Sequence, residues 1–365
     1  MSSGLTSTPA ADGFSMPAEW AAHAGCFLIW PERSDNWREG ATPAQQAWVA
    51  LVEAISTTEA VTVLVSTRQH DSARRLLPTH VRLVEMATDD AWVRDTGPTF
   101  VTNPAGEIRG VCWGFNAWGG LLGGLYFPWD ADALVGRTIC DLERTPHYRP
   151  DLILEGGSIE VDGVGTVLTT EECLLNPNRN PHLSRDQIEQ FLHSHLGTSK
   201  VIWLPRGVYL DETDGHIDNL ARFASPGVVM LTWTDDIDDP QYARSTEALD
   251  VLQRSTDATG RALTVVKIHQ PGPLTLTETE ANGVDAVAGS QPRVAGARLA
   301  GSYVNSYIGN GIVVLPVFDD PHDAAAIANY ENLFPNRQVI TVPGREILLG
   351  GGNVHCITQQ LPAHL

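Results

Sequence analysis

The chain has few cysteines, few positive charges and no long apolar run, and each shortage argues against a class of protein. None of its five cysteines has the CxxC spacing of a zinc knuckle, and their odd number disfavours a disulfide framework. With 24 Lys and Arg against 44 Asp and Glu, the net charge is −20, which disfavours nucleic acids and anionic membrane surfaces as partners. No apolar run approaches the ~18 residues of a membrane span.

The N-terminal segment, MSSGLTSTPAADGFSMP, lacks the basic start and the apolar core of a signal peptide. We therefore expect a cytoplasmic protein in which residues 1–14 are disordered. The remaining residues, 15–365, contain no low-complexity linker, and a chain of this length can bury a sizeable core. They are expected to form a single domain.

A short pattern recurs along the chain: a polar segment, then a glycine about ten residues later, then an apolar run. It occurs around Gly106, Gly165, Gly227 and Gly311, with a weaker fifth start at Gly25. Each occurrence predicts two strands joined by a glycine-containing turn. Between them lie stretches with helical periodicity and caps, at 42–56, 183–197, 238–260 and 320–334. This order predicts an α/β repeat closed around an axis, with a generic α/β domain as the alternative.

Cys356 differs from the other four cysteines in its surroundings. It lies in LLGGGNVHCITQQ, among polar residues and after three glycines, whereas the others lie in apolar segments. A structural cysteine favours apolar neighbours, and a nucleophile needs a polar and partly open setting. The glycines would also let the backbone approach a ligand closely. The pattern favours Cys356 as a nucleophile over a structural thiol.

His216 is the best candidate for a base that serves this thiol. On a strand, the adjacent His355 would point away from whatever Cys356 attacks, because neighbouring residues face opposite sides. His216 and Asp218 in DETDGHIDN are two residues apart, so on a strand they would share one face. The other histidines fit a core or surface role better.

Two more carboxylates stand out, and a metal has to be considered beside them. Asp95 follows Trp92 and Arg94 in DDAWVRDTGP, and Glu155 lies beside two glycines in LILEGGS. An acidic residue in an apolar strand needs a partner. For Glu155 a histidine would suit, because a carboxylate fixes the imidazole tautomer, and a strand-end ion pair is the alternative. The stretch DETDGHID is rich in oxygen ligands, but no second His or Cys stands at ligand spacing, so no metal is expected.

Taken together, these motifs resemble the agmatine deiminases of the guanidine-modifying, or pentein, superfamily. The resemblance runs from about residue 15 to 362 and rests on segments such as WPERSDNWREG, DDAWVRDTGPTFV, LEGGSIEV, DETDGHIDN and GGGNVHCITQQ. It implies a five-bladed α/β propeller, the pentein fold, as a single catalytic domain over 15–365 with the active site on its axis. Cys112 before WGF and Ser306 in SYVNSY depart from the family pattern.

The resemblance also implies a role for each catalytic candidate. Cys356 matches the nucleophile, His216 the general acid and base, and Glu155 the carboxylate that orients this histidine. Asp95 and Asp218 match the pair that grips the guanidinium of the substrate. The implied reaction hydrolyses agmatine to N-carbamoylputrescine and ammonia in putrescine biosynthesis. It needs no cofactor and no metal, and the family implies a homodimer or larger assembly.

Recognition of the rest of the substrate falls to other residues. Trp92 matches an aromatic residue that lines the substrate slot. An acidic side chain should accept the primary ammonium at the far end of agmatine, and Glu212 is the first choice, with Asp214 and Asp89 as alternatives. The net negative charge of the chain would also attract a dication, although salt screens this attraction beyond about 8–10 Å.

Three other functions stay open. A bacterial-type peptidylarginine deiminase shares the Asp, His, Asp and Cys, but it acts on arginine within a peptide and usually carries extra domains. A non-catalytic, polyamine-binding pentein would have no need of the thiol. An amidinotransferase would pass the amidino group to an amine instead of water, and the GGGNVHCITQQ segment favours hydrolysis.

Overall fold

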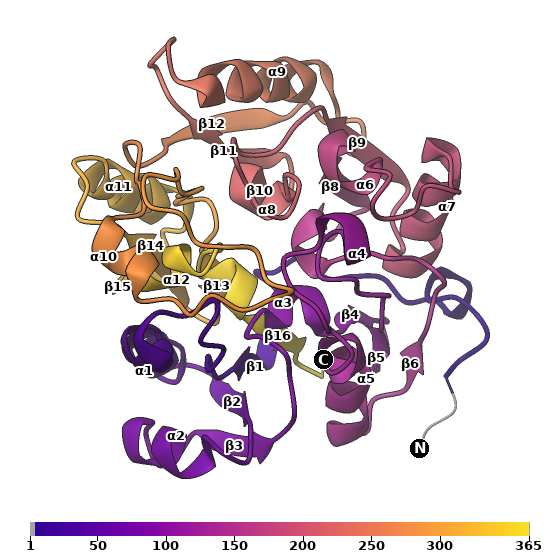
Figure 1. Cartoon of the computed structure of the whole chain (residues 1–365). Coiled ribbons are helices and arrows are strands. Elements are labelled where there is room, and N and C mark those ends of the chain that lie inside the picture. The colour runs from indigo at the N-terminus through magenta and orange to yellow at the C-terminus, as the bar shows by residue number, and fades with distance from the viewer. Residues whose placement is uncertain (1–3, 365) are drawn as a thin grey trace.

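Five small sheets surround a central axis in the computed structural model, which describes residues 4–364 (Figure 1). In each sheet an antiparallel pair is extended by a parallel strand. Helices cross between the second and third strands, because a parallel pair needs a long connection. The predicted five-bladed α/β propeller is thereby confirmed.

Four blades are each built from one continuous segment. Their strands are β4 Thr99–Thr102, β5 Ile108–Val111 and β6 His147–Tyr148; β7 Glu160–Val161, β8 Thr166–Thr170 and β9 Lys200–Leu204; β10 Ala221–Ser225, β11 Val228–Trp233 and β12 Thr264–His269; and β13 Tyr307–Gly309, β14 Ile312–Val317 and β15 Gln338–Pro343. The helices that cross within them are α4 Gly120–Gly123, α5 Asp132–Leu142, α6 Glu171–Leu174, α7 Arg185–Leu196, α9 Pro240–Arg254 and α11 Asp323–Leu333.

The remaining blade joins the two ends of the chain. It has the order β16-β1-β2-β3, with β16 Gln359–Pro362, β1 His23–Ile29, β2 Ala60–Val65, β3 Arg82–Glu85, α1 Thr42–Ile55 and α2 His70–Leu76. Because the antiparallel partner of β1 comes from β16, the prediction of a local strand pair after Gly25 is wrong. The local pairs predicted at the other four glycines are present.

The four predicted helices form, and their ends follow from local chemistry. The helix expected over 183–197 is α7, whose N-cap Ser184 accepts from the Gln187 amide while the Gln187 side chain binds back. It stops at Gly197, which has φ 67°, a left-handed conformation that glycine adopts without strain. The helices predicted over 42–56, 238–260 and 320–334 correspond to α1, α9 and α11.

The prediction of a disordered segment over 1–14 does not hold for residues 4–14, and residues 1–3 lie outside the described part. The Leu5 amide donates to the His147 carbonyl at 2.8 Å, and Phe14 is buried in an apolar cluster. Polar composition suggested disorder, but Leu5 and Phe14 anchor the segment to the blade that contains β4–β6. The expected division of the chain at residue 15 stays a prediction.

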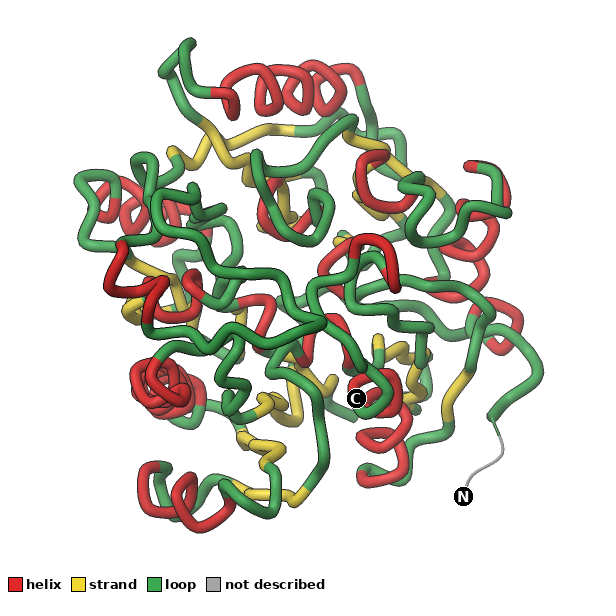
Figure 2. Tube along the Cα trace, viewed as in Figure 1, coloured by secondary structure: helices red, strands yellow, loops and turns green. Residues whose placement is uncertain are grey.

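Apolar packing holds neighbouring blades together. Each of four buried clusters combines side chains from more than one blade, for example Leu168 of β8 with Leu231 of β11. Burying such side chains contributes about 1.5–3 kcal/mol each. The long connection between β12 and β13, which includes α10 Glu278–Asn282, crosses the face of the ring (Figures 1 and 2). Within residues 4–364, no helix is long and apolar enough to cross a membrane.

Candidate active site

Short helical turns gather at the axis, each directly before the first strand of a blade. They are α3 Val93–Thr96, η3 Gly156–Ser158, α8 Ile217–Leu220 and η4 His355–Ile357, and α12 Arg345–Leu349 leads into the last of them. η3 contacts both α3 and α8, and α3 contacts η4. The turns or the residues capping them carry all five predicted catalytic residues, each at least 95% buried: Asp95, Glu155, His216, Asp218 and Cys356.

The expected strand geometry for His216 and Asp218 is wrong. His216 caps α8 and Asp218 lies in its first turn. They meet at one site because α8 faces the axis, and not because they alternate along a strand. His355 and Cys356 likewise lie in the 3-10 turn η4.

Gly157 lies where three polar groups converge. A Cβ atom at this residue would come within 2.5 Å of His216 Nδ1, 2.9 Å of Asp95 Oδ1 and 3.0 Å of Asp218 Oδ2. The Gly157 amide donates to Asp95 Oδ1 at 2.8 Å. Any side chain here would therefore push against the catalytic candidates, which explains the second glycine of the LEGGS motif.

The Cys356 thiol lies beside an amide and a carboxylate. Its Sγ is 3.3 Å from Asn305 Nδ2 and 3.8 Å from Asp218 Oδ2. Burial, followed by the charges of Asp218 and Asp95, raises the thiol pKa well above its usual range. The raised pKa favours the protonated form of this thiol. Asn305, from the turn before β13, was not predicted, although it lies in the quoted SYVNSY segment.

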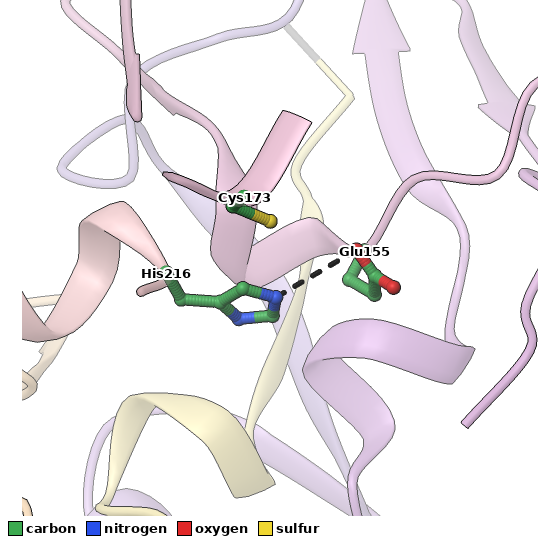
Figure 3. Close-up of side chains that lie close together, drawn as sticks. All are labelled: Glu155, Cys173 and His216. Atoms are coloured by element: carbon green, nitrogen blue, oxygen red, sulfur yellow. Dashed lines mark ion pairs between the residues drawn. The ribbon is translucent and has the colours of Figure 1, made fainter. Parts of the chain in front are cut away.

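A buried network holds His216 and Glu155 (Figure 3). Glu155 Oε2 lies 3.7 Å from His216 Nε2, and Arg179 Nε donates to Glu155 Oε1 at 2.7 Å. Burial disfavours the charge on Glu155, but Arg179 and His216 outweigh it and lower the Glu155 pKa. Burial likewise opposes charge on His216, and Asp95 with Glu155 nevertheless holds the His216 pKa well above its usual range. Sequence reasoning found the histidine partner of Glu155 and missed Arg179.

Glu155, Cys173 and His216 also have the donor types of a metal site. One potential ligand atom of each lies within 4.8 Å of the others (Figure 3). The Arg179 guanidinium, however, already binds Glu155 and would repel a metal cation there. Burial raises the pKa of Cys173, which opposes the thiolate that a metal requires. The cluster fits a setting for His216 better than a metal centre.

A second network lies behind Asp218. His355 Nδ1 is 2.8 Å from Asp218 Oδ2, and His355 Nε2 is 2.6 Å from Glu19 Oε2. Glu19 also accepts from Arg222 at 2.6 Å. Burial raises the Asp218 pKa, but the hydrogen bond and charge of His355 outweigh it, so the Asp218 pKa is lowered. The strand argument for His355 does not apply in this 3-10 turn, and His355 binds the same Asp218 oxygen that lies 3.8 Å from Cys356 Sγ. Its contact favours the ionised form of Asp218.

A narrow channel adjoins these groups, although none of the five catalytic candidates is itself part of its lining. Trp92 and Trp118 line it. The Trp118 indole donates to Asp95 Oδ2 at 2.9 Å, and Trp92 donates to Asp90 Oδ2 at 2.8 Å. Trp92 lies on the channel wall as expected, and its ring meets the Trp118 ring edge to face, with centroids 6.4 Å apart.

Glu212 and Arg293 form the outer part of the channel. Glu212 Oε1 pairs with Arg293 from the β12–β13 connection. Glu212 Oε2 is buried without a hydrogen-bond partner among residues 4–364. Gly351 has φ 109°, and a Cβ there would come within 2.3 Å of that oxygen. The glycines before Cys356 thus make room for Glu212 and Trp92, rather than only for a ligand.

The other two candidate amine acceptors have different partners. Asp214 accepts from Asn178 and Arg179, each at 2.8 Å. Asp89 accepts from the amides of Ala131 and Asp132 at the start of α5. Glu212 is the member of this trio that lines the channel.

The sequence matches the family model of Porphyromonas-type peptidyl-arginine deiminases over residues 15–362. The agmatine deiminases of Pseudomonas aeruginosa (strain LESB58) and Ectopseudomonas mendocina (strain ymp) are each 59% identical over 98% of both chains. The chain belongs to the agmatine deiminases. The solved structure of agmatine deiminase of Enterococcus faecalis is 45% identical, covers 100% of both chains and superposes with a TM-score of 0.97.

Some other solved structures are less similar. The putative arginine deiminase from Porphyromonas gingivalis is 30% identical, with 96% of this chain and 98% of that chain covered and a TM-score of 0.82.

Of the two departures from the agmatine deiminase pattern, Ser306 is not part of the channel lining, and its hydroxyl donates to Tyr330 Oη at 2.9 Å. The resemblance inferred from the motifs is confirmed.

Proposed function

We propose that the chain hydrolyses agmatine to N-carbamoylputrescine and ammonia through a covalent intermediate on Cys356. The observation that carries the proposal is the arrangement around Gly157. There a thiol, two carboxylates and a histidine–carboxylate pair converge. Trp118, which donates to Asp95, connects these groups to an aromatic channel that Glu212 also lines. Such a site suits a cation at both ends.

Asp95 and Asp218 would bind the guanidinium. A Cβ at Gly157 would come within 2.9 Å of Asp95 Oδ1 and 3.0 Å of Asp218 Oδ2, so the two carboxylates lie near one another, and Asp218 Oδ1 is buried without a hydrogen-bond partner among residues 4–364. Carboxylates match the planar N–H groups of a guanidinium in bidentate geometry. They also favour the protonated and more electrophilic form of the substrate.

Substrate binding would activate the nucleophile. Burial and then the charges of Asp218 and Asp95 raise the pKa of the Cys356 thiol in the free protein. A guanidinium bound between them neutralises that effect, so the thiol ionises once the electrophilic carbon is in place. This ties thiolate formation to the arrival of a substrate cation.

The reaction then proceeds in two halves. Cys356 Sγ attacks the central carbon, and His216 donates a proton to the departing amino group, which leaves as ammonia. The remaining S-alkylthiouronium is attacked by water, whose proton passes to His216. The tetrahedral adduct expels the Cys356 sulfur and yields the ureido product. Glu155 keeps His216 oriented and charged, with Arg179 fixing Glu155.

The outer end would select agmatine over arginine. Glu212 Oε2 can accept a hydrogen bond from the primary ammonium of agmatine. The α-carboxylate of arginine would instead be repelled by the negative charge of Glu212, and a peptide carbonyl has no hydrogen to donate to it. Arg293, which pairs with Glu212 Oε1, fixes the carboxylate in this position.

The test is to incubate the protein separately with agmatine, arginine and a peptidyl-arginine, and to measure ammonia and the ureido product. We expect stoichiometric ammonia and N-carbamoylputrescine from agmatine, with kcat/KM at least tenfold above the other two. A faster reaction of the peptide would favour the peptidylarginine deiminase alternative. Formation of a new guanidine on an added amine, with putrescine released in equal amount and without ammonia, would favour the amidinotransferase. Binding of agmatine without turnover would favour the non-catalytic alternative.

Three further expectations extend the proposal: a homodimer or larger assembly, a cytoplasmic location, and a role in putrescine biosynthesis. Light scattering of the purified protein over a range of concentrations tests the first. Fractionation of cells that express the full chain tests the second. A role in putrescine biosynthesis is tested by deleting the gene, which should lower the amount of putrescine that cells form from added agmatine.

A further inference from the structure

Cys112 and Cys140 lie next to each other, away from the channel residues. Cys112 directly follows β5, and Cys140 lies in the last turns of α5. Their sulfur atoms are 3.8 Å apart. The strand makes room for the second sulfur at Gly110, where a Cβ would lie 2.4 Å from Cys140 Sγ. Among residues 4–364, the sulfur atoms of Cys26, Cys173 and Cys356 are not paired with another cysteine, and these three serve as internal references.

The two thiols differ in access. Cys140 is fully buried, whereas Cys112 is partly exposed and lines a surface pocket. Arg137 and Arg149 line the same pocket. The neighbouring Cys112 thiol and burial both raise the pKa of Cys140. A reagent from solution therefore meets Cys112 first, and the two guanidiniums favour an anionic reagent.

We propose that Cys112 and Cys140 form a redox-active dithiol that reacts with anionic, low-molecular-weight disulfides. The Cys112 thiolate attacks one sulfur of the disulfide and releases one thiol, which leaves a mixed disulfide on Cys112. Cys140 then loses its proton and attacks Cys112 Sγ, which expels the second thiol and forms the Cys112–Cys140 disulfide. Two protein thiols are oxidised, and one small disulfide is reduced to two thiols.

The Cys112–Cys140 disulfide would restrain part of the channel wall. It closes the segment from Cys112 to Cys140, which contains Trp118, Leu125 and Tyr126 of the channel wall. A cross-link of this kind limits the unfolded chain and raises the melting temperature of the folded one. Reduction by a dithiol reverses it, so the channel wall gains a removable restraint.

The experiment uses the full chain and glutathione disulfide as the probe. After exposure, remaining thiols are blocked with N-ethylmaleimide, and the peptides are mapped without reduction. We expect a Cys112–Cys140 cross-linked peptide, a Tm rise of several °C, and loss of both on treatment with dithiothreitol. If Cys112 and Cys140 remain fully alkylated by N-ethylmaleimide after an exposure that modifies Cys356, the proposal is overturned.

Single variants separate the two steps. Cys140→Ser should stop at one glutathionyl group on Cys112, and Cys112→Ser should acquire neither that group nor a cross-link. Cys26→Ser, a buried cysteine elsewhere, should behave like the unmodified chain. Should the Cys140→Ser protein fail to fold, the same order can be read from the unmodified chain, where the mixed disulfide on Cys112 must rise and fall before the cross-link. A mixed disulfide that forms first on Cys140 contradicts the order.

The role of the arginines has its own readout. Glutathione disulfide should cross-link the unmodified chain severalfold faster than the uncharged hydroxyethyl disulfide, at equal concentration. Arg137→Gln together with Arg149→Gln should remove this preference and leave the slower, uncharged reaction unchanged. Equal rates with both reagents in the unmodified chain would overturn the preference for anions.

Discussion

The two ends of the channel are built in different ways. The inner end consists of short turns that come from different blades, and its polar atoms are fixed by buried partners such as Arg179 and His355. The outer end depends on Arg293, which comes from the long connection between β12 and β13. That connection is held at the channel by backbone hydrogen bonds of residues 289 and 291 to residues 127 and 125.

The difference indicates which part of the site performs chemistry and which part selects the substrate. Groups that stabilise a transition state must be held rigidly, because small displacements are costly. A contact four methylenes away contributes equally to the substrate complex and the transition state. Substitutions at the inner end should therefore lower kcat/KM through the chemical step, and those at the outer end mainly through KM.

The largest effect should come from Cys356→Ser. We expect the fold to remain and turnover to fall by about 10⁴-fold or more, because a hydroxyl cannot replace the activated thiol. Cys173→Ser is the matched control, since Cys173 is also buried and lies next to His216, and it should keep most activity. A haloacetamidine should label Cys356, as judged by peptide mapping. Labelling of Cys173 with activity retained would contradict the assignment.

Asp95→Asn and Asp218→Asn should have the next largest effects. Loss of one buried charged partner costs about 3–5 kcal/mol, and each 1.36 kcal/mol is tenfold. We expect kcat/KM for agmatine to fall roughly a hundred- to several thousand-fold in each variant. Thermal unfolding controls for misfolding. A loss below tenfold in a folded variant would mean that the residue does not hold the guanidinium.

At the outer end, Glu212→Gln should raise KM for agmatine roughly ten- to a hundred-fold and change kcat little, since a charged hydrogen bond contributes about 1.5–3 kcal/mol. The preference for agmatine over butylguanidine, which lacks the amine, should shrink by the same factor. Asp214→Asn is the control, because Asp214 binds Arg179 and Asn178 instead. An unchanged preference in Glu212→Gln would remove Glu212 as the amine contact.

A smaller and graded effect should appear with pH. Burial raises the pKa of Asp95 to about 6, with His216 opposing and Asp218 and Glu155 adding to the shift. The ionised form binds the guanidinium, so kcat/KM should fall as the pH drops below about 6, by about tenfold per unit. The fall in kcat should begin at lower pH, because the bound cation stabilises the carboxylate. A flat kcat/KM from pH 7 to pH 5 would contradict this role.

The smallest effect should come from chelation. Prolonged dialysis against EDTA should leave kcat and KM for agmatine unchanged, because the proposed steps use only side chains and water. The Glu155, Cys173 and His216 cluster makes this test worthwhile. Loss of activity that a divalent ion restores would overturn the proposal for the inner end.

Much of the fold could be predicted because its signals are local. Four glycine turns and four helices lie where the pattern indicates them, and two of these helices, α7 and α9, have a side-chain N-cap. The β1–β16 pair could not be predicted from periodicity, since nothing near Gly25 specifies a partner from the other end of the chain. The packed N-terminus was missed for a similar reason, because Phe14 is buried by residues far along the sequence.

The inner end of the site could be predicted because its residues stand in distinctive motifs. Residues that hold a catalytic group in place, without contacting the substrate, could not be predicted from their motifs. Arg179 lies in NPNRNP and Glu19 in MPAEW, and neither segment shows by itself that its charged residue is buried beneath a catalytic group. Arg293 lies in a segment with no periodicity at all, and its pairing with Glu212 depends on how the β12–β13 connection crosses the ring.

The pairing of β1 with β16 can form only when synthesis of the chain is almost finished. Phe27 pairs with Gln359, which is made more than 330 residues later. Until then, the edge of β1 that pairs with β16 is unpaired. The turn that holds Cys356 leads directly into β16, so the nucleophile and the closing strand emerge from the ribosome together. A nascent or prematurely terminated chain therefore lacks the Cys356 thiol, although the other four cysteines are made before it. It also displays an unpaired strand by which chaperones and proteases can recognise it as unfinished.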